Sequence, residues 1–247
     1  SRRNCPMKIV LSPSKTKTIS HTAAVIRDGQ FQLLITQKIV KHVQSLDVAA
    51  LGKALKLKGD KAQSVFDFYE EFESHPVGFA CESYDGIAFK YLDWTGLSDE
   101  AKAFGETHLA IMSALYGVVE PTMGVRDYRL DMVDKVGLNL YEILREAVDA
   151  YFHKEDWILN LASKEYAKMV NHPKVVTVEF WELRGDTYKQ MSTSSKMSRG
   201  MIAHACLTSQ VKHVRDLPRE INGFICVTDI ESITIPSESM TIRYERK

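Results

Sequence analysis

Cysteine is scarce in this chain, and the few cysteines that occur lie far apart. The sequence of 247 residues has four of them and no C-x-x-C pair. A disulfide framework or a structural zinc site needs cysteines at short, regular spacings. We therefore expect reduced thiols, no metal centre and no bound cofactor. The four cysteines are Cys5, Cys81, Cys206 and Cys226.

The histidines also lack the spacing of metal ligands. None of the eight belongs to an H-x-x-x-H or H-E-x-x-H pair, the patterns that place two imidazoles on one helix face to hold zinc. A site that combines His108 with Asp131 or Glu165 is the one alternative. Hydrogen-bonded or solvated histidines explain the pattern better.

Long apolar runs and net charge are missing as well. No stretch reaches the roughly 18 apolar residues of a membrane span, and no apolar signal-peptide core is visible at the start. We expect a cytoplasmic protein without a membrane partner. Lysine plus arginine equals aspartate plus glutamate at 32 each. Binding to nucleic acid would therefore have to come from a local basic patch.

The chain is long enough to bury a large core, and its pattern mixes strands with helices. It is 45% hydrophobic. Buried strands are expected at residues 8–11, 111–119 and 157–161, and an amphipathic helix at 140–151. We predict one compact, monomeric α+β (mixed α/β) domain over residues 7–247, with a central mixed sheet and flanking helices. Residues 1–6 precede a plausible initiator methionine, and we take them as an addition from cloning.

Further elements are expected from local signals. Ser98 precedes acidic residues and is typical of a helix N-cap. Arg184-Gly-Asp186 lies between two strand-like stretches, 175–183 and 187–191, and indicates a hairpin. A short helix is expected from Ser163 and a longer one over 196–209.

Apolar periodicity predicts three helices over residues 31–73, and the connection between the second and third is basic. Residues 36–61 carry six lysines and two aspartates, whereas residues 62–82 carry five acids and no lysine or arginine. The stretch resembles a helix-hairpin-helix element over about 47–73, in which a glycine allows a tight turn and free amides meet a phosphate. A plain helix connection with solvated lysines is the alternative. The candidate DNA-binding residues are Lys56, Lys58, Gly59 and Lys61.

The stretch "MKIVLSPSKT" joins an apolar strand to a turn that bears a lysine. Pro13 ends the strand because proline lacks an N–H donor. Ser12 and Lys15 have the S-x-x-K spacing of serine acyl-enzymes, but that chemistry needs a helix beginning at the serine. A Walker A loop is excluded, since there is no glycine between Met7 and Arg27.

Two further polar clusters could supply charges to a binding site. Arg129 and Asp131 are two residues apart, which places both on one face of an extended segment. Lys196 and Arg199 are three apart at a helix start and share a face. Each cluster alone is consistent with a solvated surface. Together with Lys15 they offer four cations that an anion-binding cleft could collect.

Seven stretches, in this order along the chain, resemble the YaaA peroxide-stress family. They cover nearly all of residues 7–247, which makes the set more specific than any single motif. They are "IVLSPSKT" (9–16), "YDGIAFKYL" (84–92), "HLAIMSALYGVVEP" (108–121), "YRLDM" (128–132), "NLASKEY" (160–166), "SRGM" (198–201) and "GF…RYE" (223–224 and 243–245).

The resemblance implies a protein of the oxidative-stress response that limits free iron and so limits Fenton damage. It also implies a mixed α/β fold with a positively charged cleft and a helix-hairpin-helix element that bind duplex or branched DNA. The matching cleft positions are Ser12, Pro13, Lys15, Thr16, Tyr128, Arg129, Lys196, Arg199 and Gly200, and the hairpin matches at residues 56–61.

The chain departs from the family pattern in two places. Glu120 stands where the family often has an arginine, which removes a cation. Tyr141 is followed by Glu142 and lacks the tryptophan that is common after it.

Two functions therefore remain open. We favour a non-enzymatic protein that binds DNA through its backbone. The alternative is an enzyme acting on a small phosphorylated or nucleotide-like ligand in the same cleft, with Asp131 or Glu165 as general base. Direct iron storage finds little support, because the chain has no paired E-x-x-H motif.

Overall fold

The computed structural model describes residues 5–19 and 33–247. Two parts of the sequence-based expectations lie outside these residues: positions 1–4 and positions 31–32 at the start of the first predicted helix. Cys5 is buried, and the Pro6 carbonyl oxygen accepts a hydrogen bond of 2.8 Å from the Asp156 amide. In the described part of the chain, no helix combines the length and apolar character needed to cross a membrane.

A mixed sheet forms the centre of the molecule, with strands in the order β4-β3-β1-β6-β7-β11-β10-β9 and β8 paired to β7. The strands β3, β1, β6, β7 and β11 are mutually parallel, whereas β4, β8, β9 and β10 pair antiparallel. A separate ladder joins β2 and β5. The strands are β1 (Met7–Leu11), β2 (Gly78–Phe79), β3 (Leu109–Ser113), β4 (Gly117–Val119), β5 (Gly124–Val125), β6 (Trp157–Asn160), β7 (Val175–Arg184), β8 (Thr187–Lys189), β9 (Glu220–Ile221), β10 (Phe224–Cys226) and β11 (Met240–Arg246).

The inner parallel strands are covered on both faces. Ile9 of β1 lies between Leu109 of β3 and Leu159 of β6, and all three side chains are fully buried. Strands buried on both faces read as continuous apolar runs because no position faces water. This explains why residues 8–11 and 157–161 show no alternation.

Helices surround the sheet and form a separate lobe. Helix α6 packs on β1 and β3, α9 on β7, α7 on β4, and α5 and α6 both pack on α9. The helices are α1 (Leu33–Gln44), α2 (Val48–Leu55), α3 (Asp60–Glu70), α4 (Ala80–Ser83), α5 (Ile87–Leu92), α6 (Asp99–His108), α7 (Leu140–Phe152), α8 (Lys164–Ala167) and α9 (Ser192–Thr208), with 3₁₀ turns at Phe72–Ser74, Trp94–Gly96 and Val214–Asp216. The predicted mixed α/β fold with a central mixed sheet and flanking helices is thus confirmed.

Several helices begin where local chemistry predicts. The Ser98 hydroxyl accepts a hydrogen bond from the Ala101 amide at 3.1 Å, which caps α6. Asn139 caps α7 in the same way through the Glu142 amide. These side chains satisfy amides that a helix N-terminus leaves without a partner. The long C-terminal helix starts four residues earlier than expected, at Ser192 rather than 196.

The prediction of a single strand over residues 111–119 is wrong. The chain turns back at Ala114–Tyr116, and β3 and β4 pair antiparallel. The turn is itself buried, so it lacks the polar residues that normally mark a turn. The Ser113 hydroxyl takes their place by accepting hydrogen bonds from the amides of Leu115 and Tyr116 at 3.2 and 3.0 Å.

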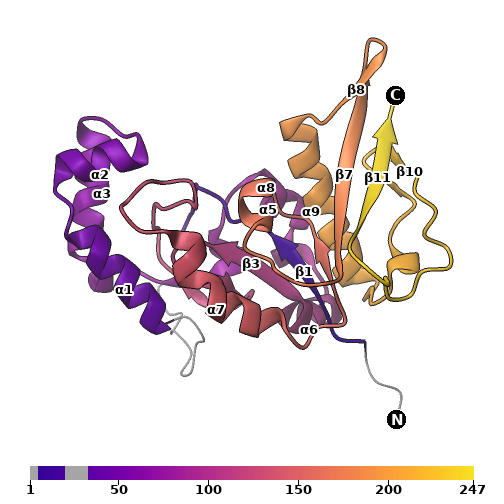
Figure 1. Ribbon diagram of the computed structural model, residues 1–247, viewed down its shortest axis with the longest axis horizontal. Helices are drawn as coiled ribbons and strands as arrows, with labels where there is room; N and C mark the ends of the chain where they lie inside the picture. The colour runs from indigo at the N-terminus through magenta and orange to yellow at the C-terminus, as the bar shows by residue number, and fades with distance from the viewer. Residues whose placement is uncertain (1–4, 20–32) are drawn as a thin grey trace.

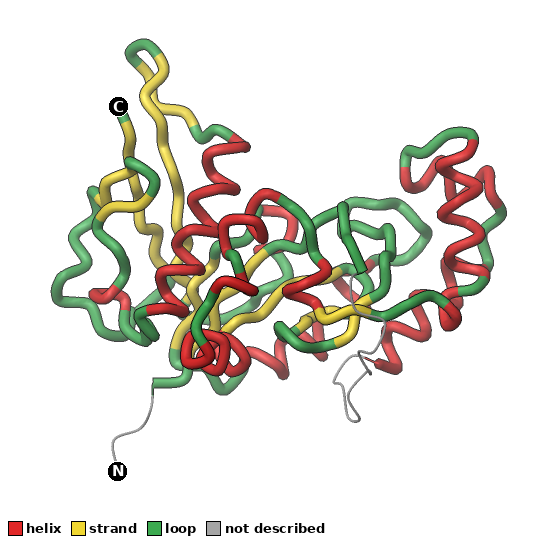
Figure 2. The backbone as a smooth tube through the Cα atoms, turned by 180° about the vertical axis from the view of Figure 1, so that it is seen from behind, coloured by secondary structure: helices red, strands yellow, loops and turns green. Residues whose placement is uncertain are grey.

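Two features project from opposite ends of the body (Figure 1). Helices α1, α2 and α3 form a lobe at one end, which is also seen from behind in Figure 2. The hairpin of β7 and β8 rises at the other end. Its turn at Arg184–Thr187 confirms the predicted hairpin, with Gly185 at a φ of 66°.

Candidate functional site

A cleft of about 440 Å³ opens where β1 and β6 end. From β1 the chain crosses to β3 on one side, and it then returns past β1 to β6 on the other side. The two connections diverge at this point of the sheet, and such switch points, at the carboxyl ends of parallel strands, are where α/β proteins bind ligands. The cleft gathers most of the predicted site residues: Ser12, Lys15, Thr16, Asp131, Glu165, Lys196 and Arg199.

The loop after β1 is fixed by its serines. The Ser12 hydroxyl accepts a hydrogen bond of 2.8 Å from the Ser163 amide and lies 3.2 Å from the Ser163 hydroxyl. The Ser14 hydroxyl donates to the Thr16 carbonyl oxygen at 2.6 Å and accepts from the Asp85 amide at 3.0 Å. These bonds fix the backbone of the loop. They therefore also fix the position from which the Lys15 side chain extends.

Gly86 allows this loop to approach the start of α5. A Cβ atom at Gly86 would lie 2.7 Å from the Cβ atom of Ser14, closer than two such atoms pack. A glycine is therefore needed for the two walls of the cleft to meet.

Two carboxylates, Asp131 and Glu165, also line the cleft. The Tyr166 hydroxyl donates to Asp131, and the Lys15 ammonium lies 3.8 Å from the same carboxylate. Glu165 accepts a hydrogen bond of 3.4 Å from the Val133 amide. Burial, with the charge of Asp131 adding to it, raises the pKa of Glu165 above its usual value. A carboxyl group with a raised pKa can take up or release a proton near neutral pH.

Helix α9 supplies cations from a third side. Lys196 is exposed, whereas Arg199 is half-buried and its Nε atom is buried without a hydrogen-bond partner. Burial lowers the pKa of Arg199. A buried guanidinium N–H without an acceptor is costly, which makes this group a ready partner for an anion.

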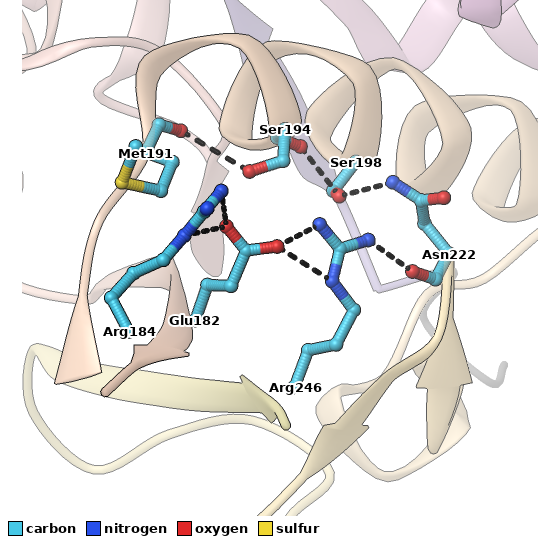
Figure 3. Close-up of polar contacts among 7 residues, drawn as sticks. All are labelled: Glu182, Arg184, Met191, Ser194, Ser198, Asn222 and Arg246. Atoms are coloured by element: carbon cyan, nitrogen blue, oxygen red, sulfur yellow. Dashed lines mark hydrogen bonds and ion pairs between the residues drawn. The ribbon is translucent and has the colours of Figure 1, made fainter. Parts of the chain in front are cut away.

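A polar network at the base of α9 fixes this helix to the sheet (Figure 3). The Glu182 carboxylate lies between the guanidinium groups of Arg184 and Arg246. Arg246 also donates to the Asn222 carbonyl oxygen at 2.9 Å, and the Asn222 side-chain amide donates to the Ser198 hydroxyl at 3.1 Å. The network thereby anchors the turn of α9 that precedes Arg199.

Arg129 does not line this cleft. It borders a separate hollow of about 420 Å³, together with Ile19, Phe68 and His75. Its carbonyl oxygen accepts a hydrogen bond of 2.7 Å from the Tyr69 hydroxyl of α3. The predicted set of four cleft cations is thus reduced to three among the described residues. Arg129 and Asp131, expected on one face, line different cavities.

The basic connection between α2 and α3 lies in the projecting lobe. Lys56, Lys58, Gly59 and Lys61 are all exposed there. Gly59 has a φ of 58° and a ψ of −130°, a conformation essentially restricted to glycine. A Cβ atom on Gly52 would lie 2.9 Å from the Leu57 carbonyl oxygen of the connection and 3.1 Å from the Ala62 Cβ atom of α3, so a glycine there lets the two helices pack closely.

Lys17 does not line the cleft, but it is bonded to the backbone of the loop that does, and sequence reasoning missed its burial. Its side chain is buried beside Tyr128, whose hydroxyl lies 2.7 Å from that of Tyr84 and 2.8 Å from that of Ser113. Lysine is almost always exposed, so no sequence signal indicated this burial. Tyr166 was also missed as a partner of the cleft carboxylate, although it belongs to the quoted stretch "NLASKEY".

Metal ligation has no support in the geometry of the described residues, where no three histidine, cysteine, aspartate or glutamate side chains are placed to hold an ion together.

The fold and site define a mixed α/β protein with a pocket at a sheet switch point that is lined by both cationic and acidic side chains. A family model described as "Peroxide stress protein YaaA" matches residues 7–225. The chain belongs to this family.

Relatives of similar length carry a family designation as their name. A UPF0246 protein of Finegoldia magna is 30% identical over 223 residues, which are 86% of this chain and 89% of that protein. One of Desulfitobacterium hafniense is 30% identical and covers 87% of this chain and 90% of its own. A UPF0246 protein of Agathobacter rectalis is 28% identical over 92% of this chain and 96% of that protein. The similarity therefore extends over both the lobe and the cleft.

Proposed function

We propose that this protein acts in the cytoplasmic response to peroxide, where it limits free iron and Fenton damage and binds DNA through its backbone. The observation that carries DNA binding is the lysine cluster at the α2–α3 connection. Lys56, Lys58 and Lys61 are exposed at one turn of a lobe that projects from the body (Figure 1). Contacts of this kind supply salt-dependent affinity without reading sequence.

The cleft would add a second contact to the same polyanion. Lys15 and Lys196 are exposed at its rim and Arg199 lies deeper. A DNA segment held at two separate places is bound according to its shape, so we propose structure-dependent binding, with duplex and branched DNA as the substrates to compare.

The salt dependence of DNA affinity tests the role of the α2–α3 connection. Each lost phosphate contact lowers the slope of log K against log salt by about 0.9, so the triple variant K56A/K58A/K61A should lower it by about 2 to 3. The matched control is K135A/K154A/K189A, which removes three exposed lysines elsewhere and leaves the same net charge. If the slope of log K against log salt is the same for the two triple variants, the α2–α3 connection is not the DNA contact.

Iron control is tested in cells that lack their own copy of the protein. We expect the wild-type chain to lower chelatable iron, measured by electron paramagnetic resonance after a peroxide challenge. A chain that leaves iron unchanged would reject this part of the proposal. The same measurement on K56A/K58A/K61A shows whether iron control depends on the DNA-binding lysines.

The second candidate function is binding, or conversion, of a small phosphorylated or nucleotide-like molecule in the cleft. The observation that favours it is a cavity lined both by Arg199, whose buried Nε atom has no hydrogen-bond partner, and by Glu165, whose pKa is raised. A volume of about 440 Å³ is in the range of pockets for small ligands. Asp131 or Glu165 would serve as the general base of such a reaction.

Thermal unfolding with a panel of nucleoside monophosphates tests this candidate. A ligand that binds only the folded state stabilises it in a saturable manner, so we expect a rise of several degrees that Arg199→Ala abolishes. The control is Lys164→Ala, an exposed lysine next to Glu165 that does not line the cleft. The absence of a shift with every nucleotide, phosphate ester and carboxylate tried would argue against the candidate.

A further inference from the structure

Some of the charged groups in the cleft have no opposite charge beside them. Asp131 is matched locally, since Tyr166 donates to it and the Lys15 ammonium lies 3.8 Å away. Arg199 is different, because burial alone lowers its pKa and no carboxylate acts on it. The pKa of Glu165 is raised by burial and by other carboxylates, with no cation opposing the shift.

The two uncompensated groups belong to different walls. Arg199 comes from α9, which also carries Lys196, whereas Glu165 comes from the short helix α8 that follows β6. Both line the same cleft. Within the described residues no ion pair joins them, so each keeps its capacity for a partner that enters from solvent.

The surface between these two walls is mixed. Ser12 and Ser163 line the cleft but already bond each other, so their hydroxyl groups are partly used. Pro13 and the partly exposed side chain of Ile87 provide apolar contact. Such a surface suits a short carbon skeleton more than a second charged group.

We infer that the cleft binds a small molecule with an anionic group, phosphate or carboxylate, at one end and a hydrogen-bond donor, hydroxyl or amino, at the other. The anionic group contacts the side chains of Arg199 and Lys196, and the donor contacts the Glu165 carboxylate. This inference rests on the small-ligand candidate function above and specifies the chemistry of that ligand.

A simpler ligand fits the charges less well. An inorganic anion fills the Arg199 end and brings no hydrogen-bond donor to Glu165. A continuous run of phosphates brings further negative charge to Glu165 and Asp131, which like-charge repulsion opposes. A ligand with a donor at its second end avoids both costs.

Calorimetric titration with matched ligands tests the inference. Ethyl phosphate carries only the anion, phosphoethanolamine adds an amino group, and ribose 5-phosphate adds hydroxyl groups. Propionate and β-alanine repeat this comparison with a carboxylate in place of the phosphate, since propionate carries only the anion and β-alanine adds an amino group. A hydrogen bond to a charged group favours the donor-bearing ligand by about tenfold or more, so we expect at least one donor-bearing ligand to bind that much more tightly than its partner.

Two variants assign the ends. Glu165→Gln keeps the shape of the side chain and removes its charge, so it should reduce a preference for amino ligands about tenfold and leave a hydroxyl preference largely intact. Arg199→Ala should weaken all of the ligands together, whereas the control Lys164→Ala should weaken none. Thermal unfolding of each variant without ligand verifies that it is folded.

The outcomes separate this inference from the function on which it rests. The inference of a ligand with two different ends would be overturned if the donor-bearing ligands bind no more tightly than their partners. That is the result if ethyl phosphate, phosphoethanolamine and ribose 5-phosphate have equal affinities, and propionate and β-alanine do too. Anion binding would then still stand. An amino preference that Glu165→Gln does not change would also overturn the inference. No binding of any phosphate ester or carboxylate would reject the small-ligand function itself.

Discussion

The ammonium group of Lys17 lies 4.2 Å from the centre of the Tyr128 ring and donates a hydrogen bond of 2.7 Å to the Tyr128 carbonyl oxygen. It donates a second bond of 3.0 Å to the Lys15 carbonyl oxygen. One buried side chain therefore ties the loop after β1 to the segment that leads to Asp131. Burial lowers the pKa of Lys17 to about 8, although Asp131 and Asp127 oppose the shift.

Lys17→Met should destabilise the protein, because two carbonyl oxygens lose their donor. We expect a loss of about 1 to 3 kcal/mol in the free energy of unfolding at pH 7. The folded pKa of Lys17, about 8, lies below the unfolded value of 10.5, so between these values the folded state binds fewer protons. The stability of the wild type relative to the variant should then rise through that window. Urea unfolding at pH 7 and pH 9.5 measures both differences, and equal differences would contradict the prediction.

Gly59→Ala should destabilise the lobe through its backbone alone. A Cβ atom at Gly59 meets nothing within 4 Å, but the φ of 58° and ψ of −130° are strained for any other residue. A strained residue of this kind costs on the order of 1 to 3 kcal/mol. The control Lys53→Ala, on the exposed face of α2, should change stability by less than about 0.5 kcal/mol. Equal effects of the two substitutions in urea unfolding would show that this turn is not strained.

The elements that the sequence predicts best are those that bury one face or carry a cap. Helix α7 is the clearest case, since its apolar stripe is regular and Asn139 caps its first turn. The turn between β3 and β4 is the opposite case. It is buried, its polar groups are satisfied by Ser113, and it leaves the apolar run unbroken. A pattern of hydrophobicity cannot show such a turn.

The candidate site is predictable in part because strand ends meet at one edge of a sheet. Lys15 follows β1 and Glu165 follows β6, and these two strands are parallel neighbours. Arg129 is directed elsewhere because the segment that bears it is hydrogen-bonded to α3 through Tyr69. That contact joins residues 60 positions apart, and nothing local in the sequence encodes it. The burial of Lys17 was missed because lysine is almost always exposed.

Glu182→Gln should weaken the anchor of α9 at neutral pH but not at low pH. Arg246 and then Arg184 lower the pKa of Glu182 by hydrogen bonding. A carboxyl group whose folded pKa is depressed stabilises the folded state above its unfolded pKa, and the stabilisation is lost as pH falls. Because the arginines are partly exposed, we expect less than about 1 kcal/mol. The gap in melting temperature between wild type and variant should therefore shrink from pH 7 to pH 3.5, and a constant gap would contradict this linkage.

The buried thiols of Cys81 and Cys206 should not react directly with peroxide. Burial raises the pKa of Cys206 to about 12 and that of Cys81 well above its usual value. The thiolate is the reactive form, so both residues remain protonated and inaccessible in the folded protein. We expect dimedone to label neither residue after exposure to peroxide, and to label both when the protein is first unfolded in urea. Labelling of either thiol in the folded state would instead indicate a redox sensor.

Gly200→Ala tests whether close packing of α9 on α5 positions the Arg199 guanidinium. A Cβ atom at Gly200 would lie 2.2 Å from the Ala88 carbonyl oxygen and 3.0 Å from the Tyr91 Cβ atom, so the helices must separate. Alanine favours a helix over glycine by up to about 1 kcal/mol, whereas overpacking costs about 1 to 3 kcal/mol. We expect a net loss of stability and a smaller thermal shift with phosphate esters.

The control for this substitution is Thr193→Ala, an exposed position on the same helix, which should leave both measurements within error. The two readouts separate packing from positioning. A Gly200→Ala protein that is at least as stable as the wild type would mean that helix propensity outweighs the contact with Ala88, and that α9 can move without cost. A destabilised variant with an unchanged ligand shift would mean that the guanidinium keeps its place when the helix moves. If Gly200→Ala lowers both the stability and the ligand-induced thermal shift, while Thr193→Ala changes neither, then anion binding depends on the close approach of the two helices.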